Sequence, residues 1–281
     1  MDRTVITVAP TGAESSKADV PALPVTLAEL VTTARDCAAV GASVVHVHIR
    51  DDEARPTLAL GRLRETVAAL RAETDLIVQL STGGAVTDGE ADRLAVLDAE
   101  PDMASCTMGT VNFGRDVFCN RWDFIVELHT RMRDRRIVPQ YELFDLGHVA
   151  SLHRLLDRHG LPYGGHVHVD LVMGVPGGMP GTAAAMVAAV AELPVGATFS
   201  ATGVGRSTLP VALAALSTGG HLRVGMEDSL SYAPGRPVRN NTELVARAAG
   251  LARVAQRPPM AVAEVRALLG IRDDSAAALT R

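Results

Sequence analysis

Two histidines separated by one residue stand at the end of a short apolar stretch. His46 and His48 belong to a predicted strand at 43–49 and are followed directly by Arg50 and Asp51. Because side chains alternate along a strand, both imidazoles point to one face, roughly 6.5 Å apart along the backbone, and can reach the same ion. The pair is therefore predicted to bind a catalytic divalent metal, with zinc favoured; packing or simple hydrogen bonding is the alternative.

A second pair with the same spacing, His166 and His168, begins a predicted strand at 166–173 instead of ending one. In a barrel of parallel strands the active site lies at the C-terminal ends of the strands. We therefore expect these two histidines to be hydrogen-bonded near the opposite end of the barrel. A second metal site or a polar substrate wall is the alternative interpretation.

Catalytic zinc usually has three protein ligands and one open position, and Glu227 is the predicted third ligand. It ends a predicted strand at 221–227, and in a closed barrel this eighth strand lies beside the first, which lies beside the second. Arg223 has the same strand parity and should point inward beneath Glu227, where a buried cation needs a partner. Asp228 is that partner or a base; a structural Arg–Asp pair that closes the barrel is the alternative.

Further polar side chains collect where predicted strands end. Together they predict a polar mouth above an apolar barrel, as in enzymes that distribute their chemistry over several strands. The segment 203–207 follows the seventh strand and opens a helix, so its free backbone N–H groups and an arginine are predicted to receive an anion. The polar residues at strand ends are Ser81, Thr82, Ser105, Thr107 and Glu142, and those of the anion site are Gly205 and Arg206.

Short β-branched or apolar stretches alternate with longer amphipathic stretches along the chain, which is typical of a parallel sheet. Eight such units in one series favour a closed (β/α)8 TIM barrel over an open sheet. The predicted strands are 4–10, 43–49, 76–82, 102–108, 137–144, 166–173, 197–202 and 221–227. The predicted helices are 27–40, 60–73, 88–98, 115–134, 148–159, 182–193, 207–219 and 241–256. We expect one domain over 1–281, with a helical C-terminal extension at about 258–281.

Three predicted helices begin with capping signals. Thr26 with Glu29, and Thr87 with Glu90, have the Ser/Thr-x-x-Glu pattern in which each side chain bonds the backbone of the other. Asn241 or Thr242 is predicted to cap the eighth helix. These signals support the predicted starts of the helices.

Composition excludes several classes of protein. The chain of 281 residues has a net charge of −5, with acidic and basic residues interspersed, so no basic face is available for nucleic acid or anionic lipid. No apolar stretch is long enough to span a membrane, and the N-terminus lacks a secretory signal, so we expect a cytoplasmic protein. Cys37, Cys106 and Cys119 lack the spacing of a thiolate metal site and are predicted to be reduced thiols.

Several short motifs occur in one order over nearly the whole chain, and together they are far more specific than one His-x-His pair. They lie at 11–14 with Pro24, and at 41–51, 81–84, 101–113, 142–145, 203–206 and 223–228. In this combination the sequence resembles the β-keto acid cleavage enzymes of the 3-keto-5-aminohexanoate cleavage type.

The resemblance implies a zinc-dependent TIM barrel that condenses a β-keto acid with acetyl-CoA as co-substrate. The adduct is then cleaved to acetoacetate and a new acyl-CoA. Residues that match the family's zinc ligands are His46, His48 and Glu227; those that match substrate-binding positions are Glu14, Ser81 and one of Ser105 or Thr107; those that match catalytic positions are Glu142, Arg223 and Asp228. A homo-oligomer, commonly a tetramer, is also implied.

In the mechanism that this resemblance implies, Arg223 keeps Asp228 ionised, and Asp228 removes the α-proton of the keto acid. Glu14 matches the position that meets a distal amino group, so its charge favours a cationic substrate tail; capping of loop N–H groups is its alternative role.

A metal-dependent aldolase or hydrolase on the same barrel is an alternative function, which would be distinguished by its independence of acetyl-CoA. A non-catalytic small-molecule sensor is the alternative from another class.

Overall fold

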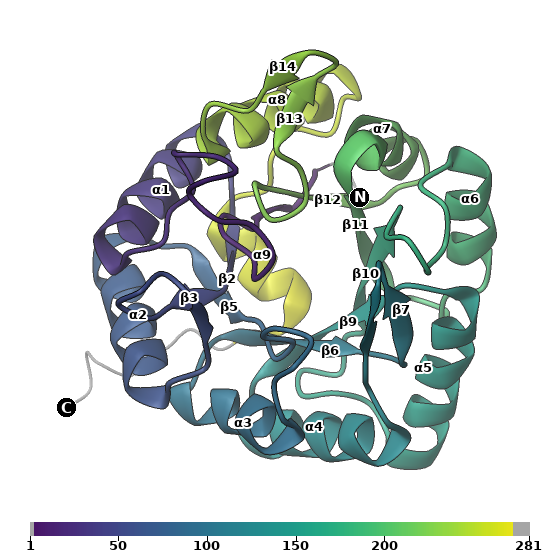
Figure 1. The fold of residues 1–281 in the computed structure, drawn as a ribbon. Coiled ribbons are helices and arrows are strands. Elements are labelled where there is room, and N and C mark those ends of the chain that lie inside the picture. The colour runs from purple at the N-terminus through teal and green to yellow at the C-terminus, as the bar shows by residue number, and fades with distance from the viewer. Residues whose placement is uncertain (1–2, 272–281) are drawn as a thin grey trace.

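The computed structural model describes residues 3–271, in which eight parallel strands close into a barrel surrounded by helices (Figure 1). The strands follow one another around the barrel in chain order, and the last pairs with the first. They are β1 (Ile6–Val8), β2 (Val44–Val47), β5 (Ile77–Leu80), β6 (Met103–Thr107), β9 (Val138–Leu143), β10 (His168–Met173), β11 (Thr198–Gly203) and β12 (His221–Val224). The predicted TIM barrel is confirmed, together with the adjacency of its eighth, first and second strands.

Helices cover the outside of the barrel and bury one side against it. In α4, for example, Phe124, Ile125, Leu128 and Met132 are buried, at the spacing of one helix face. The helices are α1 (Leu27–Val40), α2 (Leu60–Glu73), α3 (Glu90–Ala95), α4 (Trp122–Asp134), α5 (Leu146–His159), α6 (Ala183–Ala191), α7 (Thr208–Ser217), α8 (Asn241–Val254) and α9 (Val262–Leu269). None of the helices in residues 3–271 is long and apolar enough to cross a membrane.

The stretch 115–121, predicted as the start of a helix, belongs instead mostly to a hairpin at the mouth of the barrel. β7 (Val111–Phe113) and β8 (Asp116–Phe118) pair antiparallel after β6 ends. Gly114, at the turn between them, has a φ of 66°, which glycine adopts without a steric cost. Two further short hairpins are formed by β3 (Ile49–Arg50) with β4 (Pro56–Thr57), and by β13 (Ser231–Ala233) with β14 (Arg236–Pro237).

One of the three predicted caps is confirmed. Thr26 and Glu29 form the reciprocal capping box at the start of α1. The prediction for Thr87 is wrong, because α3 begins after Gly89 and Glu90 bonds Arg121. The eighth helix is capped one residue earlier than predicted, by Asn240, whose side chain accepts the Glu243 N–H.

Asn241, predicted as a cap, has another function in the structure. Its side-chain oxygen accepts the Met226 N–H at 2.9 Å, and its amide group donates to the Pro10 carbonyl at 3.1 Å. Both partners lie in segments that follow barrel strands, β12 and β1 respectively. The first turn of α8 therefore holds together the two segments on which part of the candidate site is built.

The N-terminal end of the barrel is closed by α9, the yellow helix seen through the barrel in Figure 1. An apolar cluster seals this end: Val5, Val44, Ile77, Met103, Val138, Met260, Val265, Leu269 and Ile271. α9 lies within the helical extension predicted at 258–281, of which 272–281 lie outside the described residues. With one end sealed in this way, access to the barrel interior is from the C-terminal ends of the strands.

The prediction of an apolar barrel beneath a polar mouth is wrong. Buried polar side chains continue down the inside of the barrel and bond one another: Gln79 donates to Gln140 at 2.9 Å, and Thr202 donates to Asp170 at 2.6 Å. The bulk of the apolar core lies instead between the strands and the outer helices. The polar interior supports the mouth through hydrogen bonds, because buried polar groups require partners.

His168 begins β10 at the end of the barrel opposite the mouth, as predicted. Its two ring nitrogens lie 2.8 Å from the Thr198 hydroxyl and 3.2 Å from the Ser200 hydroxyl, and His166 lies 2.7 Å from the same threonine. The ring of His221 lies 6.0 Å from that of His168. These imidazoles thus form a cluster of their own, separate from the group of His46 and His48.

His221 is expected to make the fold sensitive to acid. Its Nδ1 accepts the Val5 N–H at 3.1 Å, and burial lowers its pKa from 6.5 to about 4. In the unfolded chain this imidazole binds a proton near pH 6.5, and in the folded chain only near pH 4. The neutral imidazole therefore contributes to the free energy of unfolding above pH 6.5, and this contribution is lost as the pH falls toward 4. The loss approaches about 3 kcal/mol, at 1.36 kcal/mol per pKa unit.

We expect His221→Gln, which keeps an acceptor for Val5, to flatten the fall in unfolding free energy between pH 7.5 and pH 4.5. Urea unfolding at several pH values measures this slope. His153→Gln is the matched control, because His153 is exposed on α5. An unchanged slope in His221→Gln would show that this imidazole does not cause the acid sensitivity.

Candidate functional site

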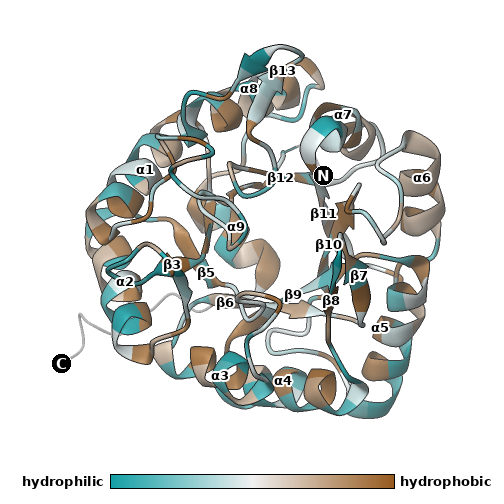
Figure 2. Ribbon diagram, viewed as in Figure 1, coloured by the Kyte–Doolittle hydropathy of each residue, from teal (hydrophilic) through white to brown (hydrophobic). Residues whose placement is uncertain are grey.

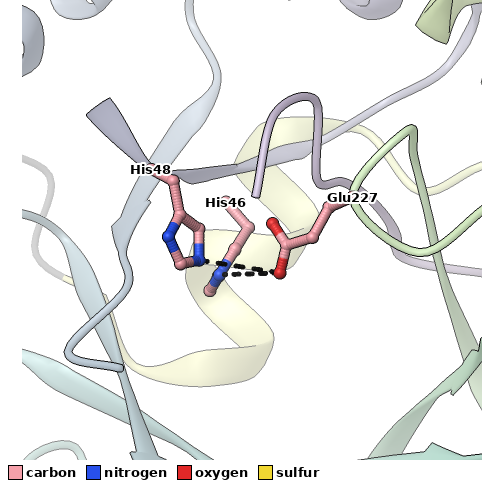
Figure 3. Close-up of side chains that lie close together, drawn as sticks. All are labelled: His46, His48 and Glu227. Carbon is pink, nitrogen blue, oxygen red and sulfur yellow. Dashed lines mark ion pairs between the residues drawn. The ribbon is translucent and has the colours of Figure 1, made fainter. Parts of the chain in front are cut away.

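His46, His48 and Glu227 converge at the mouth of the barrel (Figure 3). His46 lies in β2, His48 follows that strand, and Glu227 lies in the turn after β12. Their nearest ligand atoms all lie within 4.8 Å of one another, and Oε1 of Glu227 is 3.8 Å from Nε2 of His46 and 3.6 Å from Nε2 of His48. No other three histidine, cysteine or carboxylate side chains in residues 3–271 form such a group.

Two glycines allow the backbone segments around Glu227 to approach each other. Gly12 has a φ of 66°, and a Cβ there would lie 2.6 Å from Cγ of Glu227. A Cβ at Gly225 would lie 1.9 Å from the carbonyl oxygen of Ala9. The Glu227 N–H donates to that carbonyl at 3.2 Å, so the turn after β12 is held against the end of β1.

Gln79, which sequence reasoning missed, determines which nitrogen of His46 faces the site. Nε2 of Gln79 donates to Gln140, so its Oε1 is the acceptor that lies 2.7 Å from Nδ1 of His46. Nδ1 therefore carries the proton, and the lone pair of Nε2 points toward Glu227. Gln79 and Ser81 share one strand face, which is the sequence signal that could have found it.

Both imidazoles are held neutral, the form that binds metals. Burial, reinforced by the charge of Arg223, lowers the pKa of His46 to about 3. Burial also lowers the pKa of His48, against the attraction of Glu227.

We expect Gln79→Leu to weaken metal binding about 10- to 100-fold, the usual cost of removing the partner that orients a ligating histidine. Gln79→Glu keeps an acceptor for the Nδ1–H of His46 and should retain affinity within a few-fold. Competition with a chromogenic chelator measures both affinities, and urea unfolding of the same variants checks that each is folded. Equal affinities in wild type and Gln79→Leu would contradict the orienting role.

Arg223 is buried beneath this group and faces an excess of carboxylates. Its Nε and one terminal nitrogen donate to the two oxygens of Asp228 at 3.2 and 3.0 Å, and it also bonds Glu227. Its other terminal nitrogen is 3.5 Å from Glu142. Asp170 attracts it as well, so one guanidinium serves four carboxyl groups.

Burial and Arg223 act in opposite directions on these carboxyl groups. For Glu227 burial opposes ionisation, but Arg223 and the two imidazoles outweigh it and lower the pKa to about 2. Burial raises the pKa of Asp228 to about 7 although Arg223 lies against it. Burial likewise raises the pKa of Glu142 to about 7, despite Arg223 and a hydrogen bond from Thr107. Arg223 thus favours the ionised form of Asp228, as expected, but burial opposes it and is the larger effect.

The residues of this site fit a divalent cation. Oε2 of Glu227 is buried and has no hydrogen-bond partner, and the lone pairs of the two imidazoles face the same carboxylate. The carboxyl groups around this site outnumber the guanidinium, so a bound cation would favour their ionised forms. Two nitrogens and one carboxylate, with room for a further ligand, form the donor set of catalytic zinc sites.

A cavity of about 230 Å³ opens beside this group, and the structure places some of the predicted substrate-contacting residues on its wall. Ser81, Glu142 and Glu14 line it. Ser105 and Thr107 do not: the Ser105 hydroxyl accepts the Thr82 N–H, and the Thr107 hydroxyl donates to Glu142 at 2.8 Å. Thr107 is thus positioned to orient Glu142.

The anion site predicted at Gly205 and Arg206 is not supported by the geometry. The Gly205 N–H is already used, because it donates to the carbonyl of Asp228 at 2.8 Å. Arg206 is exposed and does not line the cavity. This loop instead helps to fix the backbone of Asp228.

Arg50, at the end of β3, is a second residue whose role sequence reasoning missed. Its guanidinium donates to the carbonyls of Gly12 and Ser15 at 2.7 and 2.8 Å, and to that of Ala54 at 3.2 Å. These bonds hold the loop between β1 and α1 against the mouth. Arg50 therefore positions one wall of the cavity.

Comparison with known proteins agrees with the motif resemblance. A sequence model of the beta-keto acid cleavage enzyme family matches residues 3–271. The chain is similar to the 3-keto-5-aminohexanoate cleavage enzyme of Acetoanaerobium sticklandii, with 36% identity over 277 residues, 96% of this chain and 99% of the relative. It is also similar to the 3-oxoadipate:acetyl-CoA acetyltransferase of Cupriavidus necator, with 34% identity over 271 residues, 95% of this chain and 94% of the relative.

The fold also occurs among solved structures. The apo structure of ObcA superimposes with a TM-score of 0.77 over 89% of this chain and 66% of its own, at 22% sequence identity. At this identity the likeness is one of fold. It agrees with the closed barrel described above.

Proposed function

The chain belongs to the beta-keto acid cleavage enzyme family, and on this premise we propose that it transfers acyl groups between a β-keto acid and acetyl-CoA. The products are acetoacetate and a new acyl-CoA. The observation that carries the proposal is the placement of His46, His48 and Glu227 in one cavity with Glu142 and Asp228. A Lewis-acid site beside carboxyl groups of raised pKa suits chemistry that begins with removal of an α-proton.

The residues that would hold the metal are His46, His48 and Glu227, and zinc is the metal that this donor set favours. A metal bound there would supply a Lewis acid for the keto and carboxylate oxygens of the substrate. The Ser81 hydroxyl lines the same cavity and is available to bind the keto acid.

Asp228 is the proposed base, oriented through both carboxylate oxygens by Arg223. It takes a proton from the carbon between the two carbonyl groups, and the electron pair left there forms a carbon–carbon bond to the acetyl carbonyl of acetyl-CoA. CoA leaves as a thiolate and attacks the former keto carbon, whose bond to the α-carbon breaks. Acetoacetate recovers the proton from Asp228, and the acyl tail leaves as the new thioester.

Glu142 lies on the other side of Arg223, and its hydrogen bond from Thr107 fixes one oxygen. With a pKa raised by burial to about 7, it exists in both protonation states near neutral pH. We propose that it binds the substrate and tunes the charge around Arg223. Thr107 acts through Glu142 as a positioning residue.

The test is product analysis by liquid chromatography and mass spectrometry, with the zinc-loaded protein and a panel of β-keto acids, with and without acetyl-CoA. We expect acetoacetate and acyl-CoA in equal amounts, formed only when acetyl-CoA is present. Cleavage without acetyl-CoA would favour the aldolase or hydrolase alternative. Binding of keto acids without turnover of any would favour the sensor.

The homo-oligomer, as a tetramer, and the cytoplasmic location stay predictions, as does the single domain over the whole chain. One surface feature supports association. Val187 on α6 and Leu209 and Leu213 on the neighbouring α7 are exposed apolar side chains. α6 is hydrophobic along its length, tan to brown in Figure 2. Apolar faces of this kind are typical of subunit interfaces.

A further inference from the structure

We propose that the β-keto acid used by this chain has a short, uncharged alkyl tail, which packs against an apolar wall opposite the metal-binding group. This inference rests on the proposed function and names its substrate class. The two relatives described above are named for substrates whose tails carry an amino group and a carboxylate, respectively. The expectation of a cationic tail from Glu14 is replaced here by one drawn from the cavity wall.

The apolar wall is built from elements on the far side of the mouth from His46 and Glu227. The metal-binding group comes from β2 and β12, which both neighbour β1, whereas the wall comes mainly from segments that end or follow β6, β9, β10 and β11. Its side chains line the same cavity: Val86, Phe113, Phe118, Phe144, Val172, Val175 and Val204. A keto acid bound by its head at the metal-binding group would therefore direct its tail toward this wall.

The wall is a packed cluster and not a set of scattered side chains. The ring of Phe113 lies 6.4 Å from that of Phe118 and 6.2 Å from that of Phe144, both in edge-on arrangements. Phe118, Phe144, Val172 and Val175 are buried together, with Phe113 and Val204 packed against them. Such rings hold a fixed shape, so the wall is formed before a substrate arrives.

Backbone polar groups of the wall are already bonded within the protein. The Phe144 carbonyl accepts the Met179 N–H at 2.7 Å, and the Val204 N–H donates to the Met173 carbonyl at 2.9 Å. A charged tail placed against this wall would lose its hydration without gaining a hydrogen-bond partner from these groups, which is costly. An alkyl tail would instead remove apolar surface from water on both sides of the contact.

Glu14, the residue expected to meet a cationic tail, lines the same cavity from outside the apolar wall and already has a cation nearby. It belongs to the loop between β1 and α1, where it is exposed. Arg50 holds that loop by bonds to Gly12 and Ser15, on either side of Glu14, and the two charges attract each other. A cationic tail is therefore not required to balance Glu14.

The first experiment compares three acids of similar length, each with acetyl-CoA: 3-oxohexanoate, 5-amino-3-oxohexanoate and 3-oxoadipate. We expect kcat/KM for 3-oxohexanoate to exceed that for each charged acid by about tenfold or more. A charged acid that is turned over faster would overturn the apolar tail and leave the proposed function standing. If 5-amino-3-oxohexanoate is preferred and Glu14→Gln removes that preference, the expectation of a cationic tail would be restored.

The second experiment places a hydroxyl on the wall. Val172→Thr and, separately, Val204→Thr should raise KM for 3-oxohexanoate several-fold and leave KM for acetyl-CoA unchanged. Val117→Thr is the matched control, because Val117 is exposed on the same hairpin as Phe118 and does not line the cavity. An increase in KM for acetyl-CoA alone would assign the wall to the thioester arm and overturn the proposal.

Failure of the proposed function would be recognised separately, by absence of turnover for all three acids. In that case calorimetric titration of the same acids into the zinc-loaded protein still tests the wall. Tighter binding of 3-oxohexanoate than of the two charged acids supports an apolar tail site. Equal or weaker binding overturns it.

Discussion

Glu227→Gln is expected to abolish metal retention and to lower kcat/KM by about a thousandfold or more. The substitution keeps the size of the side chain but removes the anionic oxygen that faces His46 and His48. It removes a ligand charge from a site where Lewis acidity contributes several kcal/mol to transition-state stabilisation, and each 1.36 kcal/mol is a factor of ten in rate. Metal content of the purified protein and steady-state kinetics with acetyl-CoA measure the two effects.

The control for this variant is Glu73→Gln, the same change at an exposed glutamate that pairs with Arg35 on the outer helices. It should retain both metal and turnover. Full metal content with near-normal kcat/KM in Glu227→Gln would show that Glu227 is not a ligand and would remove the metal-binding group from the mechanism.

Asp228→Asn should have a different signature: loss of turnover with the metal retained. The asparagine oxygen can still accept a hydrogen bond from Arg223, so the local structure should persist. The amide cannot take the α-proton, and loss of a general base costs about 10²- to 10⁴-fold in kcat. Steady-state kinetics and metal analysis, made side by side with Glu227→Gln, distinguish a base from a ligand.

Exchange of the α-proton gives a second measurement on the same variant. The wild type should exchange the α-hydrogens of the keto acid with deuterated solvent faster than Asp228→Asn does, when both are compared with the spontaneous rate. Near-normal turnover and exchange in Asp228→Asn, with zinc and substrate still bound, would assign proton removal to another group. Glu142 would then be the candidate, because it lies across Arg223 and has a similarly raised pKa.

The barrel could be predicted from the sequence because its signal is periodic and local. The predicted strands that contain His46, Ser81 and Glu142 are short and largely apolar, and the amphipathic stretches between predicted strands are long enough for helices. The hairpin around Gly114 interrupts this alternation of strands and helices, and it was missed because its residues also fit the start of a helix. Capping was predictable at Thr26, where helix and pattern coincide, and not at Thr87, where the helix begins two residues later than the pattern requires.

At the site, the sequence predicted which residues meet but not what surrounds them. His46, His48 and Glu227 could be placed together because barrel closure relates their strands. Gln79 was missed, although strand alternation points it inward, because its bonds to His46 and Gln140 depend on neighbouring strands that the local pattern does not describe.

The charge state of Asp228 and the use of the Gly205 N–H could not be read from the sequence. Both depend on burial and on a hydrogen bond between loops that are distant in the chain. The aromatic wall likewise exists only once the hairpin carrying Phe113 and Phe118 folds over the ends of β9 and β10.

The most direct test of acyl transfer traces ¹³C from the acetyl group of acetyl-CoA into the products. Zinc-loaded protein is incubated with 3-oxohexanoate and acetyl-CoA labelled with ¹³C at both acetyl carbons, and the products are read by ¹³C NMR. We predict acetoacetate labelled at its keto and methyl carbons, with its carboxylate and methylene carbons unlabelled, together with unlabelled butanoyl-CoA. Unlabelled acetoacetate, or free butanoate in place of the thioester, would contradict the proposed reaction.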